Sequence, residues 1–203
     1  MRIQTLLALI TLCVMPQWAY AHLVSTRFGE FYSGLLHPVL TLTHLVPWIA
    51  VGLFAGIQKH TTGNKVLILF PLTVLAGTFL GGIFSPAPFV ETFNLISFPI
   101  LGILIISGLA MNRLAFIATV AITGISHGFG NGLPELSGTD QLLYLMGVTC
   151  SAYVVVTLMS GLSHWLVQSQ NWGLIAVRAA GSWITAIGII YLSFTFLAPV
   201  ANH

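Results

Sequence analysis

The stretch VLILFPLTVLAGTFLGGIF, residues 66–84, decides the fold class, because it runs for 19 residues without a charged side chain. A helix rises about 1.5 Å per residue, so roughly 20 apolar residues cross the hydrocarbon core of a bilayer, which is about 30 Å thick. Residues 66–84 therefore predict a transmembrane helix.

Similar apolar segments lie on both sides of this stretch, at residues 35–57, 93–111, 114–132, 142–167 and 174–197. Polar and turn-forming connectors separate them; the shortest is Asn112-Arg113, between the third and fourth segments. Only 5% of the 203 residues are charged, whereas soluble domains carry about 25%. The sequence predicts an all-α, polytopic membrane bundle of six transmembrane helices in contact with the lipid bilayer.

The N-terminus has the pattern of a cleavable export signal over residues 1–21. Arg2 supplies the positive start, Ile3 to Val14 the apolar stretch, and Ala19-Tyr20-Ala21 a small-x-small cleavage site. The alternative is an uncleaved first helix, for which the apolar stretch is short. Cleavage gives a mature transmembrane domain of residues 22–203.

Cleavage would also make His22 the first residue. Its free α-amine and imidazole would then form a bidentate ligand for Ni²⁺ or Cu²⁺. The alternative is that His22 only begins a mobile segment.

The charged residues predict the orientation of the chain. With the mature N-terminus outside, four basic residues fall on the inner side: Lys59, Lys65, Arg113 and Arg178. The acidic residues then fall on the outer side: Glu91, Glu135 and Asp140. This asymmetry follows the positive-inside rule and predicts a bacterial inner-membrane protein with both mature termini in the periplasm. A net charge of +2 is too small to indicate a nucleic-acid partner.

Two histidines in the first segment are candidate metal ligands. His37 and His44 are seven residues apart, two helical turns, so they are expected on one helix face. Neutral imidazoles suit nickel, cobalt, zinc and copper ions. Pro38 and Pro47 each remove a backbone donor, which suits a site lined by broken helix. The alternative is that both rings simply hydrogen-bond to neighbouring helices.

A second candidate stretch runs from Ser126 to Glu135. His127 lies deep in the fourth segment and is followed by a glycine-rich exit, the amide of Asn131 and the carboxylate of Glu135. Glycine lets the backbone bend close to a ligand. The alternative is a helix that ends in an ordinary loop.

These stretches resemble the HupE/UreJ proteins, which are exported-signal, six-helix nickel or cobalt permeases associated with hydrogenase and urease maturation. The first family motif, His-Pro-x-x-Gly-x-Asp-His, is matched by His37, Pro38 and His44, with Thr41 and Thr43 at the glycine and aspartate positions. The second, Phe-His-Gly-x-Ala-His-Gly-x-Glu, resembles residues 126–132, with Asn131 in place of the second histidine and Glu135 displaced. Residues 178–181 also resemble the family.

The resemblance implies a secondary permease with transported Ni²⁺ or Co²⁺ as its metal partner and no tightly bound cofactor. His37, His44 and His127 would be ligands, and Glu135 would lie at the outer entrance. Thr43 lacks the carboxylate that would offset the charge of a divalent cation, so a non-transporting accessory protein on the same scaffold is the alternative. An intramembrane serine hydrolase is disfavoured because the sequence has no Gly-x-Ser-x-Gly elbow. Homo-oligomerisation is left open.

Overall fold

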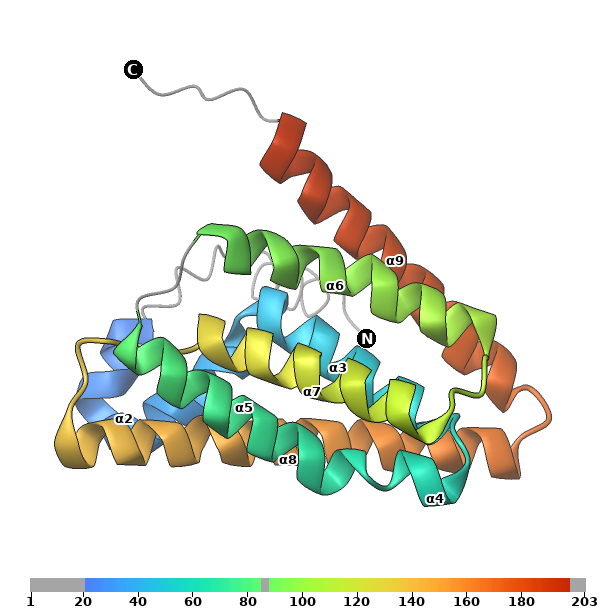
Figure 1. The fold of residues 1–203 in the computed structure, drawn as a ribbon, viewed down its shortest axis with the longest axis horizontal. Helices are drawn as coiled ribbons and strands as arrows, with labels where there is room; N and C mark the ends of the chain where they lie inside the picture. The colour runs from blue at the N-terminus through green and yellow to red at the C-terminus, as the bar shows by residue number, and fades with distance from the viewer. Residues whose placement is uncertain (1–20, 85–87, 198–203) are drawn as a thin grey trace, which may run out of the picture.

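The computed structural model describes residues 21–84 and 88–197, and the side chains of residues 29–84 and 89–196. The described residues form helices and connections without a strand. Residues 1–20 of the predicted signal and the C-terminal residue lie outside this range. The helices are α2 (Ala21–Leu40), α3 (Leu42–Gly56), α4 (His60–Gly63), α5 (Val66–Ile83), α6 (Pro88–Ser107), α7 (Arg113–Gly130), α8 (Gly138–Ser169) and α9 (Gly173–Leu197) (Figure 1).

The all-helical prediction is confirmed for this part of the chain. Residues 66–83 form α5. The break after the third predicted segment is present but covers residues 108–112, and Arg113 begins α7; Asn112 caps that helix, accepting a 2.8 Å hydrogen bond from the Ala115 amide. Within the described residues, four helices are long and apolar enough to cross a membrane, or five spans if the bent pair α2–α3 counts as one. Helix α7 is not among them, so the count of six spans stays a prediction.

The first predicted span is broken rather than continuous. Thr41 has extended backbone angles, φ −100° and ψ 103°, and the helices before and after it are bent by 77°. Pro38 and Pro47 lie on either side of the break and cannot donate the backbone bonds that would stiffen it. His37 and His44 therefore lie on two different helices, and the expectation of a single helix face is wrong.

Helices α5 and α7 pack with their backbones in close contact. A Cβ atom added to Gly77 would collide with the Ile125 backbone, and one added to Gly128 would collide with the Val74 backbone. Gly81 meets Phe129 and Gly132 in the same way. Small residues at four-residue spacing thus allow the backbones of the two helices to approach closely.

Helix α3 occupies the centre of the bundle. It packs against α8 on one side and α6 on the other, and Trp48, Ala50 and Phe54 are almost completely buried. Helices α6 and α9 form a separate close pair, in which Gly102 meets Gly181 and Gly188 meets Pro99 (Figure 1). The histidine end of α3 consequently lies where these groups of helices meet.

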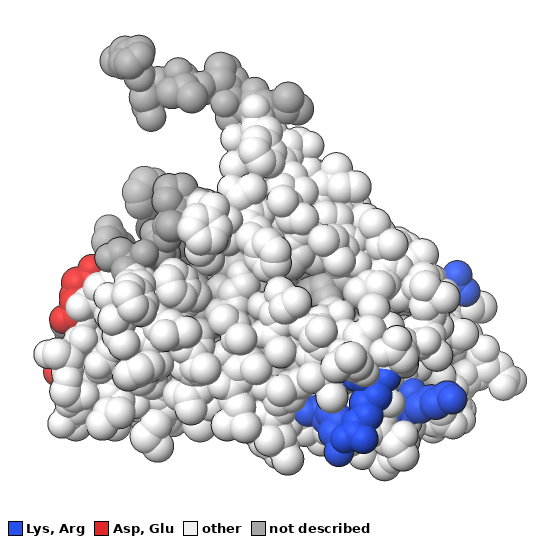
Figure 2. Space-filling model, in the orientation of Figure 1, with Lys and Arg blue, Asp and Glu red and all other residues white. Residues whose placement is uncertain are grey.

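The surface suits a membrane. Large apolar side chains are highly exposed on several helices, including Leu114 at 77%, Phe89 at 74% and Trp183 at 74%. A water-soluble protein rarely exposes so much apolar surface. Figure 2 shows the acidic side chains gathered at one end of the molecule and the basic side chains at the other. These features describe a multi-pass membrane protein with charge separated along the bundle.

This charge separation makes the orientation testable. We expect a periplasm-active reporter to be active when fused after His203 and silent when fused after Gly63, because Lys59 and Lys65 flank Gly63 and favour the cytoplasm. Reporter activity, normalised to the amount of fusion protein, measures this. Activity after Gly63 and silence after His203 would invert the predicted topology.

Candidate metal site

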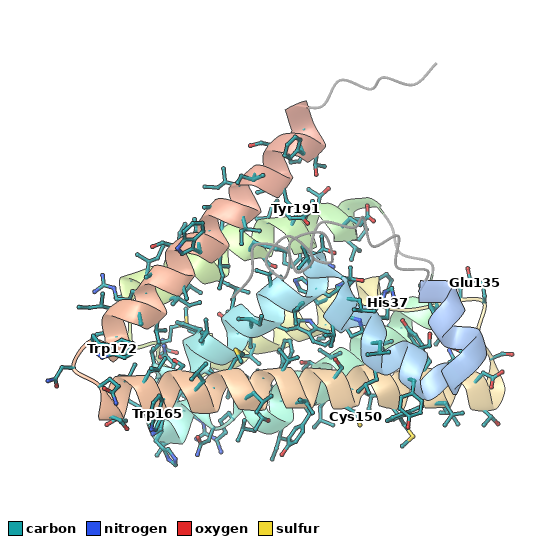
Figure 3. The ribbon with its side chains drawn as sticks, turned by 180° about the vertical axis from the view of Figure 1, so that it is seen from behind. His37, Glu135, Cys150, Trp165, Trp172 and Tyr191 are labelled. Carbon is teal, nitrogen blue, oxygen red and sulfur yellow. The ribbon has the colours of Figure 1, made fainter. Side chains whose placement is uncertain are left out.

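Three histidines from three helices form a row inside the bundle. His37 on α2 and His44 on α3 have ring centres 6.0 Å apart, and His44 and His127 on α7 have ring centres 5.9 Å apart. The break at Thr41 turns α3 so that His44 lies between the other two rings. We call this set, His37, His44 and His127, the histidine row. Figure 3 shows its first member, His37, on α2.

The spacing fits ions held between neighbouring rings. An imidazole–metal bond of about 2.0–2.1 Å puts the ion roughly 3 Å from the ring centre, so two rings sharing an ion have centres at most about 6.5 Å apart. Both neighbouring pairs in the row meet this limit. Among the described residues, no three His, Cys, Asp or Glu side chains form a closed metal site. The row therefore offers two successive two-histidine positions rather than one complete cage.

His127 is fully buried and is anchored from α6. The Ser97 hydroxyl lies 2.9 Å from Nε2 of His127 and 2.6 Å from the Asn94 carbonyl oxygen. Beside it, the Ser126 hydroxyl donates to Oδ1 of Asn94, and Nδ2 of Asn94 donates to the Ser126 carbonyl over 3.3 Å. These polar contacts join α6 to α7 at the level of the histidine row.

Asn131, immediately after α7, is held by hydrogen bonds of its side-chain Nδ2 and its backbone carbonyl. Its Nδ2 donates a 2.7 Å hydrogen bond to the His127 carbonyl, and its own carbonyl accepts a 3.1 Å bond from the Tyr144 hydroxyl. The Tyr144 ring also lies beside His37, with centres 6.4 Å apart. Asn131 therefore presents its amide oxygen, Oδ1, as the unused atom of the side chain.

Several buried atoms in this region have no hydrogen-bond partner: Nδ1 of His44, Nδ1 of His127 and Oδ1 of Asn131. Trp48, Ser151 and Thr157 also have unpartnered buried atoms, on α3 and α8. Buried polar groups normally find partners, so each exception needs a cause. For Oδ1 of Asn131, and for an imidazole nitrogen that carries a lone pair, a bound cation would supply the missing partner.

A cavity of about 350 Å³ reaches the histidine row from between α3, α6 and α9. Its lining includes His44, Thr43 and Asn94, together with Glu91 near the start of α6. The sequence placed Glu91 only as an acidic residue on the outer side. Glu91 is far from His44 in the sequence, so the sequence could not predict that both residues line one cavity.

Other candidates lie elsewhere. Glu135 is exposed on the α7–α8 connection at the end of the bundle (Figure 3) and is not among the residues that line the cavity. His22 lies in α2, but its side chain falls outside the described residues. His164 on α8 pairs with His60 on α4, with ring centres 5.8 Å apart, next to Lys59 and Lys65 at the basic end.

Comparison with known proteins shows the family of the chain. The family described as HupE / UreJ protein matches residues 10–191. The chain belongs to the HupE/UreJ family. Protein HupE of Rhizobium leguminosarum bv. viciae is 27% identical over 195 residues, which covers 94% of this chain and 97% of that protein. No solved structure matches the chain.

The two HupE/UreJ motif regions meet in space, although about 80 residues separate them in the sequence. His37 and His44 come from the first, and His127 and Asn131 come from the second. Thr41, at the motif's glycine position, is the residue at the helix break. Thr43, at the motif's aspartate position, lines the cavity next to His44.

Proposed function

We propose that this HupE/UreJ protein is a secondary permease that moves Ni²⁺ or Co²⁺ inward across a bacterial inner membrane for metalloenzyme maturation. The observation that supports this best is the histidine row, whose neighbouring ring centres are 6.0 Å and 5.9 Å apart. Its middle ring, His44, lines the cavity, and His127 beside it is fully buried. Neutral imidazole is a good ligand for nickel and cobalt ions.

The open form of the row suits transport. An ion passing through a membrane protein must bind well enough to enter and weakly enough to leave, and successive sites satisfy both needs. His44 lies between two other rings, so an ion held by His37 and His44 can pass to His44 and His127 without losing all its protein ligands. Glu91 lines the cavity and attracts cations to its entrance.

The second candidate is a non-transporting membrane accessory protein. The feature that favours it is Thr43, which leaves the part of the cavity beside His44 without the family's carboxylate. Uptake of radioactive nickel and cobalt by cells expressing the chain separates the two functions. We expect accumulation above that of cells with an empty vector. Background accumulation with abundant protein in the membrane would leave the accessory function.

Restoring the carboxylate gives a sharper test of the site. We expect Thr43→Asp to raise affinity for Ni²⁺ or Co²⁺ by about 10–100-fold, the range typical of groups that orient metal ligands. Thr43 is only partly buried and lines the cavity, so the new charge can stay hydrated there. Metal titration of the detergent-solubilised proteins measures the effect.

Thr43→Asn is the matched control, because it has the shape of aspartate without the charge. It should bind metal like the wild type. Equal affinities for Thr43→Asp and wild type, in a folded protein, would mean that the cavity beside His44 does not hold the ion.

A further inference from the structure

Ser97 makes a contact that the metal site does not explain by itself. It is buried on α6, and its only hydroxyl lies 2.6 Å from the Asn94 carbonyl oxygen and 2.9 Å from Nε2 of His127. Serine hydroxyls in helices often donate to a carbonyl one turn earlier. Ser107, on the same helix, does so to Leu104 over 2.8 Å and has no histidine partner. Ser97 is therefore a back-bonded serine with an additional bond.

The two contacts together fix the position of a proton. A hydroxyl has one proton to donate, and a backbone carbonyl can only accept. The Ser97 hydroxyl consequently donates its proton to the Asn94 carbonyl oxygen. In the bond between Ser97 and His127, the donor must therefore be the Nε2–H of His127 and the acceptor the Ser97 oxygen. In a neutral imidazole with a proton on Nε2, the other nitrogen, Nδ1, carries the lone pair.

We propose that Ser97 is a positioning residue that holds His127 in the Nε2–H tautomer, so that Nδ1 is its metal-binding atom. Nδ1 is buried without a partner, and the His44 ring lies 5.9 Å away. Metal-bound histidines usually donate their second ring N–H to an oxygen acceptor, which sets tautomer and ring orientation. The binding of a metal ion by Nδ1 rests on the proposed function, whereas the assignment of the Nε2–H tautomer to His127 does not.

The tautomer can be measured on the metal-free protein. In protein labelled with ¹⁵N-histidine, nitrogen chemical shifts distinguish a protonated Nε2 from a protonated Nδ1, and the signal lost in His127→Ala identifies His127. We expect the wild type to have protonated Nε2 at His127. Removing the acceptor in Ser97→Ala should add Nδ1–H tautomer. A wild-type His127 with protonated Nδ1, or an unchanged tautomer in Ser97→Ala, would overturn the assignment.

Metal titration then connects the tautomer to binding. Ser97→Ala should weaken nickel binding by about 10–100-fold, as loss of such an oriented group does. Ser97→Thr keeps a hydroxyl that can bond back to the helix and should restore both tautomer and affinity. Ser107→Ala, which loses the bond to the Leu104 carbonyl and the bond from the Leu109 amide but no histidine contact, should change neither. Equal affinities of Ser97→Ala and wild type would overturn the positioning role. A wild type with the expected tautomer that binds no nickel would refute only the proposed function.

Discussion

His44→Ala is expected to reduce nickel uptake to the background of cells carrying an empty vector, while the protein stays abundant in the membrane. His44 is the middle ring of the histidine row and the member that lines the cavity. Its loss removes a ligand from both two-histidine positions at once, whereas loss of His37 removes one. Radioactive nickel uptake, normalised to the amount of membrane protein, measures the effect.

Two further variants make this result interpretable. His44→Gln keeps much of the volume and polarity of the side chain, so it should be as inactive as His44→Ala without leaving a void. His164→Ala removes a histidine that has a histidine neighbour, His60, at the basic end of the bundle, and it should keep uptake. If His44→Gln transports like the wild type, or if His164→Ala loses as much uptake as His44→Ala, the histidine row is not the path of the ion.

Gly128→Ala is expected to cause a large loss of stability for the addition of a single methyl group. A Cβ there would collide with the Val74 carbonyl oxygen and come within 2.9 Å of Cα of Val74 and 3.0 Å of the Thr78 amide nitrogen. These are backbone atoms, so α7 must move away from α5. Overpacking typically costs about 1–3 kcal/mol. Unfolding titrations in mixed detergent micelles measure the change.

Gly161→Ala on α8 is the matched control, because a Cβ there meets no atom within 4 Å. It should be neutral or stabilise the helix by up to about 1 kcal/mol, the difference in helix propensity between the two residues. Gly128→Ala should also weaken nickel binding, since His127 precedes Gly128 on α7. Equal stability of the two variants would contradict close backbone packing between α5 and α7.

The positions of the helices could be predicted from the sequence where a single local feature, such as a long uncharged stretch or a capping residue, determines them. Residues 66–84 carry no charged side chain, and residues 66–83 form α5; Asn112 caps α7. The sharp bend at Thr41 could not be derived in this way. Pro38 and Pro47 indicate a weakened helix, but the 77° angle depends on how α2 and α3 each pack against α8.

The site was predictable as a set of residue types but not as an arrangement. His37, His44 and His127 were candidates because a polar group inside a membrane is costly, and the structure brings their rings together. The contact of Ser97 with His127 and the place of Glu91 in the cavity could not be predicted, because they depend on the rotation of α6 relative to α7 and α3. The rotation of α6 relative to its neighbours cannot be predicted from a local pattern in its own sequence.

The pairing of α6 with α9 gives the bundle two interfaces of different kinds. These two helices hold each other through glycine contacts, whereas α6 meets α7 at the histidine row through a few hydrogen bonds, between Asn94 and Ser126 and between Ser97 and His127. Hydrogen bonds beside a cavity can be replaced by hydrogen bonds to water at little cost in free energy. Water cannot replace the close backbone contacts at the glycines of α6 and α9 in this way. The contact between α6 and α7 at the histidine row is thus the interface that water from the cavity can replace most readily, including the hydrogen bond from Nε2 of His127 to Ser97.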